Sequence, residues 1–169
     1  ENSWSWFAIS KNKNIKIEDI ENNPDKPWDW MGISFNPNLT INFIKKNFSK
    51  DILWSAISCN RNITMKDIED NIYLPWNWMS ISNNPNITME FINKYNDYTF
   101  NWCAISGNPN ITIKDVEKYP DKPWDWSALS SNNNITMDIV EKYIEKDWNW
   151  SFISNSQNLT MKMIIKYPN

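Results

Sequence analysis

The chain has 169 residues, a formal net charge of −3 at pH 7, a sequence pI of about 5.0 and no histidine. An acidic chain lacks the net basic face that binding along nucleic acid requires, and the missing histidine removes the commonest general base and zinc ligand. No apolar run is long enough to predict a membrane span. We therefore predict a non-enzymatic protein without metal or cofactor, and without a nucleic-acid or membrane partner.

A tryptophan recurs every 24 residues along the chain without insertion or deletion. These tryptophans are Trp6, Trp30, Trp54, Trp78, Trp102, Trp126 and Trp150. A fixed period in this range is typical of stacked repeats, in which each unit buries its apolar face against its neighbours. We predict a single array over residues 1–169, with repeats that start near residues 1, 25, 49, 73, 97, 121 and 145. We expect this array to be part of a longer chain.

The first half of each repeat contains a W-x-W motif, as in residues 28–30. The position before the motif, residue 27 in the second repeat, is proline or an N-cap type of residue, and Trp30 and Ile33 have i, i+3 spacing. We predict a short helix over residues 28–34, α or partly 3₁₀. A strand is the alternative interpretation, but the alternation is brief. Small residues at position 32 predict close approach of a neighbouring element.

An Asn-Pro-Asn turn follows at residues 36–38, because asparagine tolerates the left-handed conformation that ends a helix and proline cannot continue one. Thr40 then provides an N-cap, and Leu39 and Ile44 have the spacing of a hydrophobic staple. We predict a helix of about two turns over residues 41–47. The same signals recur in nearly every repeat.

A 48-residue period overlies the shorter one. Position 43 alternates between aspartate in odd repeats and an apolar residue in even repeats, with Met163 as the exception. Asp67 and Asp115 complete a short capping box with the threonine that precedes them. The alternation predicts a super-unit of two repeats.

The pattern Ile33-Ser34-x-Asn36-Pro37-Asn38-Leu39-Thr40-xxx-Ile44 resembles the leucine-rich repeat variant, a solenoid of alternating α- and 3₁₀-helices. Here tryptophan replaces smaller aliphatic residues, and threonine replaces the proline after the turn. Residues 108–112 and 121–126 also resemble the tryptophan-rich repeat proteins of giant DNA viruses of amoebae, which implies a place in the virion or the host cytoplasm. Both resemblances extend over all seven repeats, and neither implies a catalytic residue.

We therefore predict an all-α fold, a right-handed α-solenoid of seven repeats with two short helices each. The second tryptophan of each repeat is predicted to be core, since one tryptophan buries about 150–250 Å². The aliphatic core is predicted to include Ile33, Ile44, Ile57, Ile68, Ile81 and Ile92. A stacking platform for bases or sugars is the alternative, but base-stacking sites in single-strand binders also carry positive charge. The first tryptophan of the motif is expected to pack between repeats or to be partly exposed.

Three further features bear on function. Asn-x-Thr triplets match the glycosylation acceptor, but turn and cap chemistry already explain both residues, so we interpret this asparagine column as a hydrogen-bonded ladder. The triplets begin at Asn38, Asn62, Asn86, Asn110, Asn134 and Asn158. Cys59 and Cys103 are interpreted as ordinary thiols. The last repeat is unusually apolar. Phe152 replaces a small residue, Met163 stands where the other odd repeats carry aspartate, and Ile165 stands where every other repeat is polar or charged.

Two functions follow from these features. The favoured one is a scaffold that binds a protein partner through residues that vary around a constant skeleton, such as positions 42, 45 and 46. The alternative is a structural protein that assembles end to end into filaments or a virion-associated layer. The residues predicted for that interface are Phe152, Met163 and Ile165 at one end, with Trp4 and Phe7 at the other.

Overall fold

The computed structural model describes residues 3–157 and 159–167, and within them the chain forms fourteen short helices and no strands. Each repeat supplies two helices, which confirms the predicted all-α repeat solenoid. The first helices of the repeats are α1 (Trp6–Ser10), α3 (Trp30–Ser34), α5 (Trp54–Ser58), α7 (Trp78–Ile81), α9 (Trp102–Ser106), α11 (Trp126–Leu129) and α13 (Trp150–Ser154). The second helices are α2 (Ile17–Asn22), α4 (Ile41–Lys46), α6 (Met65–Asp70), α8 (Met89–Lys94), α10 (Ile113–Lys118), α12 (Met137–Lys142) and α14 (Met161–Lys166).

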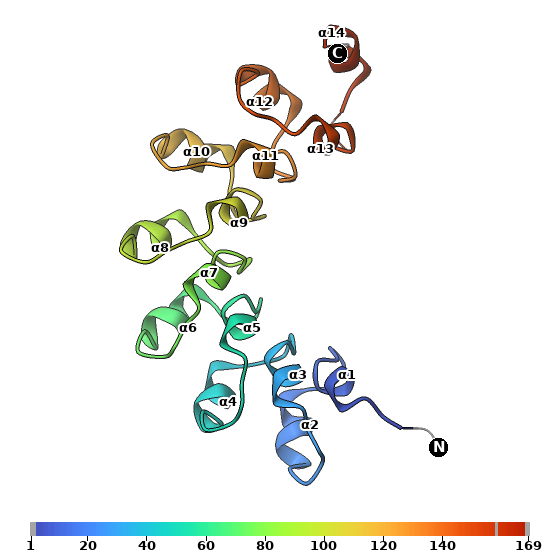
Figure 1. Ribbon diagram of the computed structural model, residues 1–169, viewed down its shortest axis with the longest axis vertical. Coiled ribbons are helices and arrows are strands. Elements are labelled where there is room, and N and C mark those ends of the chain that lie inside the picture. The colour runs from blue at the N-terminus through green and yellow to red at the C-terminus, as the bar shows by residue number, and fades with distance from the viewer. Residues whose placement is uncertain (1–2, 158, 168–169) are drawn as a thin grey trace.

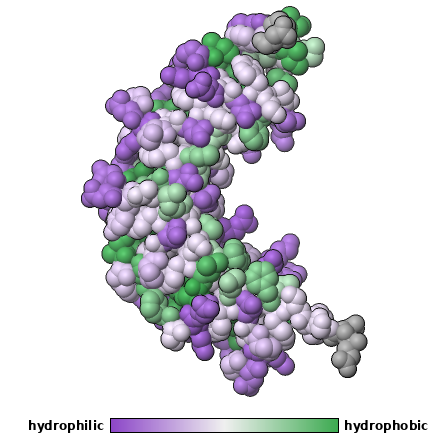
Figure 2. Space-filling model, in the orientation of Figure 1, coloured by the Kyte–Doolittle hydropathy of each residue, from purple (hydrophilic) through white to green (hydrophobic). Residues whose placement is uncertain are grey.

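The repeats stack into an arc, with the odd-numbered helices along its inner side and the even-numbered helices along its outer side (Figure 1). Successive odd-numbered helices contact one another, as α1 and α3 or α5 and α7 do. The space-filling view shows the arc as a crescent that is hollowed on the inner side (Figure 2). Each face of the crescent is therefore built from equivalent positions of successive repeats.

The first helix of each repeat begins at the second tryptophan, two residues later than predicted. In α3 the N-cap is Asp29, whose Oδ1 accepts a hydrogen bond from the Gly32 N–H at 2.7 Å. The predicted cap at position 27 is therefore wrong. The residue between the two tryptophans can reach the free N–H groups of the first turn, whereas position 27 lies two residues further away.

The predicted threonine cap is present at α4, α6, α8 and α14, whereas Thr136 of α12 makes no side-chain cap hydrogen bond. Thr40 Oγ1 accepts from the Phe43 N–H at 3.3 Å, and Leu39 and Ile44 are buried on either side of it. The capping boxes at Asp67 and Asp115 are both present. Asp19 adds one that was not predicted, since its carboxylate accepts from the backbone N–H of Lys16 at 2.7 Å.

The core consists mainly of aliphatic side chains. The six isoleucines named above, Ile33, Ile44, Ile57, Ile68, Ile81 and Ile92, are at most 1% exposed. The second tryptophans are half-buried at the edge of this core, and Trp150 is 46% exposed. This differs from the prediction that these tryptophans are core. The first tryptophan lies deeper in two repeats, since Trp76 and Trp148 are each 6% exposed.

The first tryptophan of the motif is hydrogen-bonded to the preceding even-numbered helix, whether it is buried, as Trp76 is, or half-buried, as Trp28 is. Its indole N–H donates to the carbonyl of the residue that ends the preceding even-numbered helix, as from Trp76 Nε1 to Asn71 at 2.9 Å. The same bond joins Trp28 to Asn23 and Trp148 to Tyr143. A helix end left without partners would expose unpaired carbonyls, so this indole acts as a C-terminal cap.

Gly32 accounts for the column of small residues. A Cβ added at Gly32 would lie 2.7 Å from the Phe7 carbonyl oxygen in α1 and 3.0 Å from Ser10 Cβ. The predicted close approach of a neighbouring element is therefore confirmed at this position. The spacing between α1 and α3 depends on the absence of a side chain there.

The 48-residue alternation also has a structural cause. In odd repeats the aspartate at position 43 caps its own helix, whereas in even repeats Phe43 and Phe91 stack on Trp30 and Trp78 with ring centroids 5.9 and 6.0 Å apart. The tryptophans of odd repeats meet the first tryptophan of the next repeat edge-on, as Trp54 meets Trp76 at 5.3 Å, and Trp126 of the sixth repeat meets Trp148 in the same way at 5.0 Å. The stacked phenylalanine at position 43 is therefore the feature that distinguishes the second and fourth repeats.

Candidate functional site

Buried asparagines tie each repeat to the one before it. Asn84 is fully buried, and its Nδ2 donates to the carbonyls of Ser58, Asn60 and Ile63 at 3.0, 3.2 and 3.0 Å. Equivalent bonds are made by Asn36, Asn60, Asn108 and Asn132. This ladder was not predicted. Its asparagines were expected to take the left-handed conformation, but no described residue has a positive φ.

A second asparagine ladder runs beside the first, and this one was predicted. Asn38 Nδ2 donates to the carbonyls of Lys13 and Ile15 at 2.8 and 2.9 Å, and Asn86 and Asn134 make the equivalent pairs of bonds. Glycosylation would modify this same nitrogen. Asn158, the last of these triplets, lies outside the described residues.

A serine column completes the constant frame. Ser58 Oγ accepts from the backbone N–H of Asn77 at 2.9 Å, and serines at the equivalent positions make the same bond in the neighbouring repeats. The donor in each case is the N-cap residue of the next odd-numbered helix. The two asparagine ladders and this serine column fix the repeat spacing, so variable side chains are held at defined positions.

A groove crosses the turns at the C-terminal ends of the odd-numbered helices, along the inner side of the arc. It has a volume of about 460 Å³ and draws on four consecutive repeats. Its lining residues are Phe35, Pro37, Ala56, Cys59, Asn60, Arg61, Asn83, Pro85 and Pro109. Except for Ala56 and Asn60, they occupy the positions that flank the constant asparagine. The surface of the groove is therefore set by residues that differ between repeats.

Exposed apolar side chains are also present on the odd-numbered helices α1, α3 and α7. Phe35 is 47% exposed and meets Phe7 edge-on at 6.5 Å, and Met31 and Met79 are 50% and 48% exposed. Arg61 is the single arginine of the sequence. This inner surface combines apolar contact area with one fixed positive charge.

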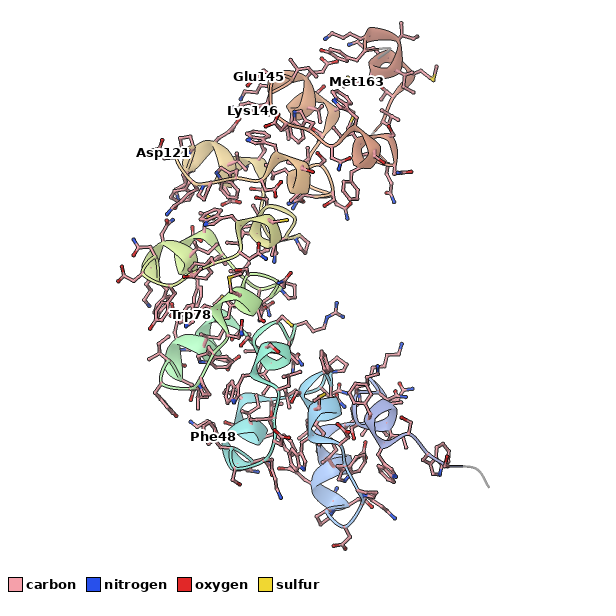
Figure 3. The ribbon with its side chains drawn as sticks, in the orientation of Figure 1. Phe48, Trp78, Asp121, Glu145, Lys146 and Met163 are labelled. Atoms are coloured by element: carbon pink, nitrogen blue, oxygen red, sulfur yellow. The ribbon has the colours of Figure 1, made fainter. Side chains whose placement is uncertain are left out.

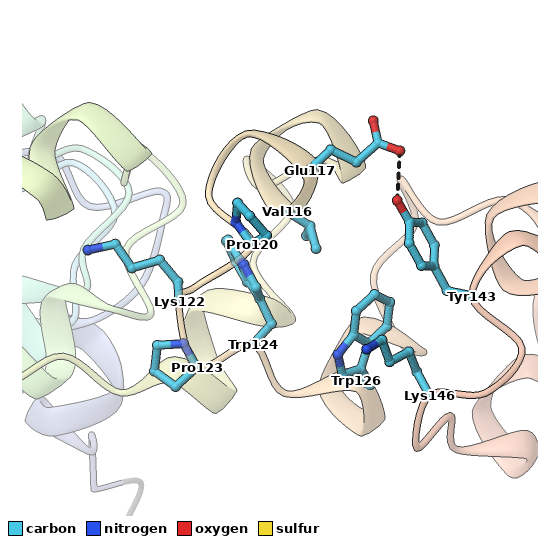
Figure 4. A pocket seen from close by; sticks show the side chains of 9 residues that line it. All are labelled: Val116, Glu117, Pro120, Lys122, Pro123, Trp124, Trp126, Tyr143 and Lys146. Carbon is cyan, nitrogen blue, oxygen red and sulfur yellow. Dashed lines mark hydrogen bonds between the residues drawn. The ribbon is translucent and has the colours of Figure 1, made fainter.

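Two pockets of another kind lie on the outer side of the arc, at Trp30 and Trp126, with volumes of about 440 and 330 Å³. Their lining includes five pairs of identical residues at positions four repeats apart. These pairs are Glu21 and Glu117, Pro24 and Pro120, Trp28 and Trp124, Trp30 and Trp126, and Lys50 and Lys146. Figure 4 shows Trp126 with Lys146 beside its ring, and Glu117 and Tyr143 meeting across from them.

A lysine partly covers the tryptophan in each of these pockets. Lys50 Nζ lies 5.5 Å from the centre of the Trp30 ring, and Lys146 Nζ lies 5.5 Å from that of Trp126. Both lysines are exposed in the loops that follow even-numbered helices, and Figure 3 labels Lys146 on the outer side of the arc. A cation–π contact at an exposed site is weak, so these side chains can be displaced.

Ion pairs between neighbouring even-numbered helices border the pockets. Lys46 pairs with Glu21 at 3.1 Å, and Lys142 pairs with Glu117. Hydrogen bonds from Lys142 and from the Tyr143 hydroxyl lower the pKa of Glu117. Because these groups are exposed, salt and water screen the pairs, and they contribute to register more than to stability.

The variable positions singled out from the sequence lie on the outer side as well. Asn42, Lys45 and Lys46 are exposed on α4, and Lys66 forms an exposed pair with Asp70 on α6 at 2.9 Å. Of these residues, Lys46 also lines the pocket at Trp30. The groove residues Phe35 and Arg61 were not predicted, although their place beside a constant asparagine was visible in the sequence.

The residues predicted for an end-to-end interface divide into two groups. Trp4, Phe152 and Ile165 are 77%, 51% and 74% exposed, and Phe7 is 36% exposed. Met163 is 4% exposed, so the prediction that it belongs to an exposed end surface is wrong. Its position is equivalent to that of Phe43 and Phe91, whose side chains pack inward.

Within residues 3–157 and 159–167 no group of three or more Cys, Asp or Glu side chains is placed to hold a metal ion. Both thiols have raised pKa values, Cys59 through burial and Cys103 through a hydrogen bond with Asp125, so the reactive thiolate is disfavoured. None of the helices described has the length and apolarity to span a membrane.

No protein-family model, curated protein sequence or solved structure matches the chain. The resemblances to the leucine-rich repeat variant and to viral tryptophan-rich repeat proteins therefore stay predictions.

Proposed function

We propose that the protein is a non-enzymatic scaffold that binds an extended segment of a partner protein along the inner groove. The observation that carries this proposal is the groove itself, which crosses four consecutive repeats. Repeat arrays bind in this way because a constant frame holds variable residues on one continuous surface.

The lining indicates the chemistry of the partner. Phe35, Cys59, Pro37, Pro85 and Pro109 supply apolar contact, and Arg61 supplies a charge-assisted hydrogen-bond donor. We infer that the bound segment carries apolar side chains and an acidic residue that pairs with Arg61. The asparagine ladders fix the spacing of the repeats and thus the shape of the groove, so the groove changes little when the segment binds.

The experiment is a selection of linear peptides on the purified protein, followed by binding to matched variants. Phe35→Glu introduces a charge into the groove, and Arg61→Ser removes its cation. Phe48→Glu introduces the same charge at an exposed aromatic residue on the outer side. Selected peptides are expected to bind Phe48→Glu as they bind the wild type, and to lose at least tenfold in affinity on both groove variants. Peptides that bind Phe35→Glu unchanged would refute the proposal.

End-to-end assembly is the second candidate, and exposed apolar side chains at both ends favour it. Trp4 lies at one end, and Phe152 and Ile165 lie at the other. A head-to-tail contact that does not close on itself builds filaments, for example within a virion-associated layer. Electron microscopy and sedimentation at rising concentration test this candidate. It predicts filaments that Ile165→Lys abolishes, whereas monomers at every concentration would exclude it.

A further inference from the structure

The two outer pockets have a third, equivalent position in the middle of the array. Trp78 stands where Trp30 and Trp126 stand in their repeats, and Tyr98 stands where Lys50 and Lys146 stand. The Tyr98 ring lies parallel to Trp78, with ring centroids 3.7 Å apart and planes 11° apart. The chain therefore places an aromatic ring of its own on this tryptophan face.

The surroundings of Trp78 repeat those of the open pockets. Phe91 stacks on Trp78 as Phe43 does on Trp30, with ring centroids 6.0 and 5.9 Å apart, and Ile139 takes this position beside Trp126. Lys94 pairs with Glu69 at 3.0 Å, the equivalent of the pairs that border the pockets at Trp30 and Trp126. The same site thus occurs in all three super-units, and the middle one holds a tyrosine.

We propose that the pockets at Trp30 and Trp126 bind tyrosine side chains of a partner protein, with Tyr98 as the chain's own occupant of the third site. The geometry of Tyr98 on Trp78 defines the ligand. A planar ring covers the indole face at stacking distance, which an aliphatic side chain cannot do. Tyr98 remains 44% exposed, so the ring lies at the rim, where a phenol hydroxyl stays in contact with water.

At the two open sites, the lysine covers less of the tryptophan ring than Tyr98 covers at the occupied site. Lys50 and Lys146 approach their tryptophans only to 5.5 Å and leave cavities of about 440 and 330 Å³. The carboxylates of Glu21 and Glu117 pair with Lys46 and Lys142. The ion pair of Lys146 is a long, exposed one with its chain neighbour Glu145 at 3.9 Å, so little is lost when that lysine is displaced. An incoming ring replaces a weak cation–π contact with a full stack.

This inference goes beyond the proposed function, because it concerns the outer side of the arc and not the inner groove. The two are tested by different variants, so either can fail while the other stands. Groove variants leave the outer pockets intact, and pocket variants leave Phe35 and Arg61 in place.

The test is a titration of the ¹⁵N-labelled protein, observed at the tryptophan indole N–H resonances. The probe is N-acetyl-L-tyrosinamide, and the comparison compounds are N-acetyl-L-leucinamide and methyl β-D-glucopyranoside. Trp30→Phe and Trp126→Phe assign the two resonances. The expected result is a saturable shift of both resonances with the tyrosine compound and none with the other two. No shift, equal shifts with leucinamide, or shifts with the sugar alone would each overturn the proposal.

Variants that exchange the covering residue make the test site-specific. Lys50→Tyr and Lys146→Tyr copy the occupied site, so each is expected to abolish the shift of its own tryptophan only. Tyr98→Lys is expected to open the middle site and add a shift at Trp78. Lys114→Tyr, on the exposed face of α10, is the control and leaves both shifts unchanged. A Trp30 resonance that still responds in Lys50→Tyr would refute the assignment, whether or not Tyr98→Lys folds.

Discussion

Asn84 donates a hydrogen bond from its side-chain amide to the main-chain carbonyl of Asn60, the residue at the same position one repeat earlier, at 3.2 Å. Asn60 in turn donates to the carbonyl of Asn36 at 2.9 Å. The side chain of each of these asparagines thus bonds to the backbone of the asparagine one repeat earlier. Stability between repeats therefore depends on a polar column as well as on the apolar core.

Asn84→Ala is expected to destabilise the protein by about 3 kcal/mol, because polar backbone groups around it lose their partners. Ile63 keeps a donor in Asn86, and Asn60 keeps the Ile63 N–H, so the loss falls on the Ser58 carbonyl and on the Asn86 N–H that donates to Asn84 Oδ1. Urea denaturation followed by circular dichroism measures the effect. Asn83→Ala changes an exposed neighbour and is the control, with an expected change below about 0.5 kcal/mol. Equal midpoints for the two variants would show that the buried ladder adds no stability.

Trp76→Phe is expected to cost about 1–2 kcal/mol, because it removes the N–H that caps α6 through Asn71 and keeps an aromatic ring. Phe100 occupies the equivalent position two residues before α9, so the fold accepts a phenylalanine there. Thermal unfolding compares this variant with Trp4→Phe, which changes an indole that is 77% exposed. If both variants have the melting temperature of the wild type, the indole cap does not contribute to stability.

The two glycines are expected to respond in opposite directions to alanine. At Gly32 the new Cβ meets the Phe7 carbonyl at 2.7 Å, so helices α1 and α3 must move apart, at a cost of about 1–3 kcal/mol. At Gly107 the nearest atom is 3.7 Å away and φ is −80°, so alanine stabilises by about 0.4–1 kcal/mol through the unfolded chain. Denaturation midpoints that move together would contradict this account of the packing.

Glu117→Gln is expected to lower stability at neutral pH and to have no effect in strong acid. The folded-state pKa of Glu117 is lowered, first through its hydrogen bond with Lys142, so its contribution is present above the unfolded pKa and is lost as pH falls through the folded pKa. Melting temperatures of wild type and variant should therefore converge as the pH falls through that range. Added salt should also reduce the difference, since both groups are exposed. A difference that persists in acid would point to a packing effect of the substitution.

The helices and their order could be predicted because their signals are local. The cap is formed by Thr40 and the staple by Leu39 and Ile44, and neither depends on the neighbouring repeats. The repeat period then fixed the architecture, since a two-turn helix is stable only when stacked. The start of the first helix was misplaced because proline or an N-cap residue at position 27 gives a competing start signal two residues before Asp29.

The remaining features depend on contacts between repeats. The role of Asn36 was missed because its acceptors lie 21 to 26 residues earlier in the chain. Trp76 is buried and Trp78 is half-buried, and the sequence could not rank them by depth, since depth depends on contacts with neighbouring helices. The pocket at Trp30 was invisible for the same reason, although the exchange of lysine for tyrosine at position 98 was present in the sequence.

The bonds of the asparagine column all have the same direction. Each amide donor belongs to a later repeat, and each carbonyl that it satisfies belongs to an earlier one. During synthesis on the ribosome, the carbonyl acceptors of one repeat therefore emerge before the asparagine of the next repeat that donates to them. The hydrogen bonds of a repeat are complete only when the next repeat has left the exit tunnel. Loss of the first repeat leaves an amide without acceptors, whereas loss of the last leaves carbonyls facing water, so the two ends of the array are not equivalent sites for truncation.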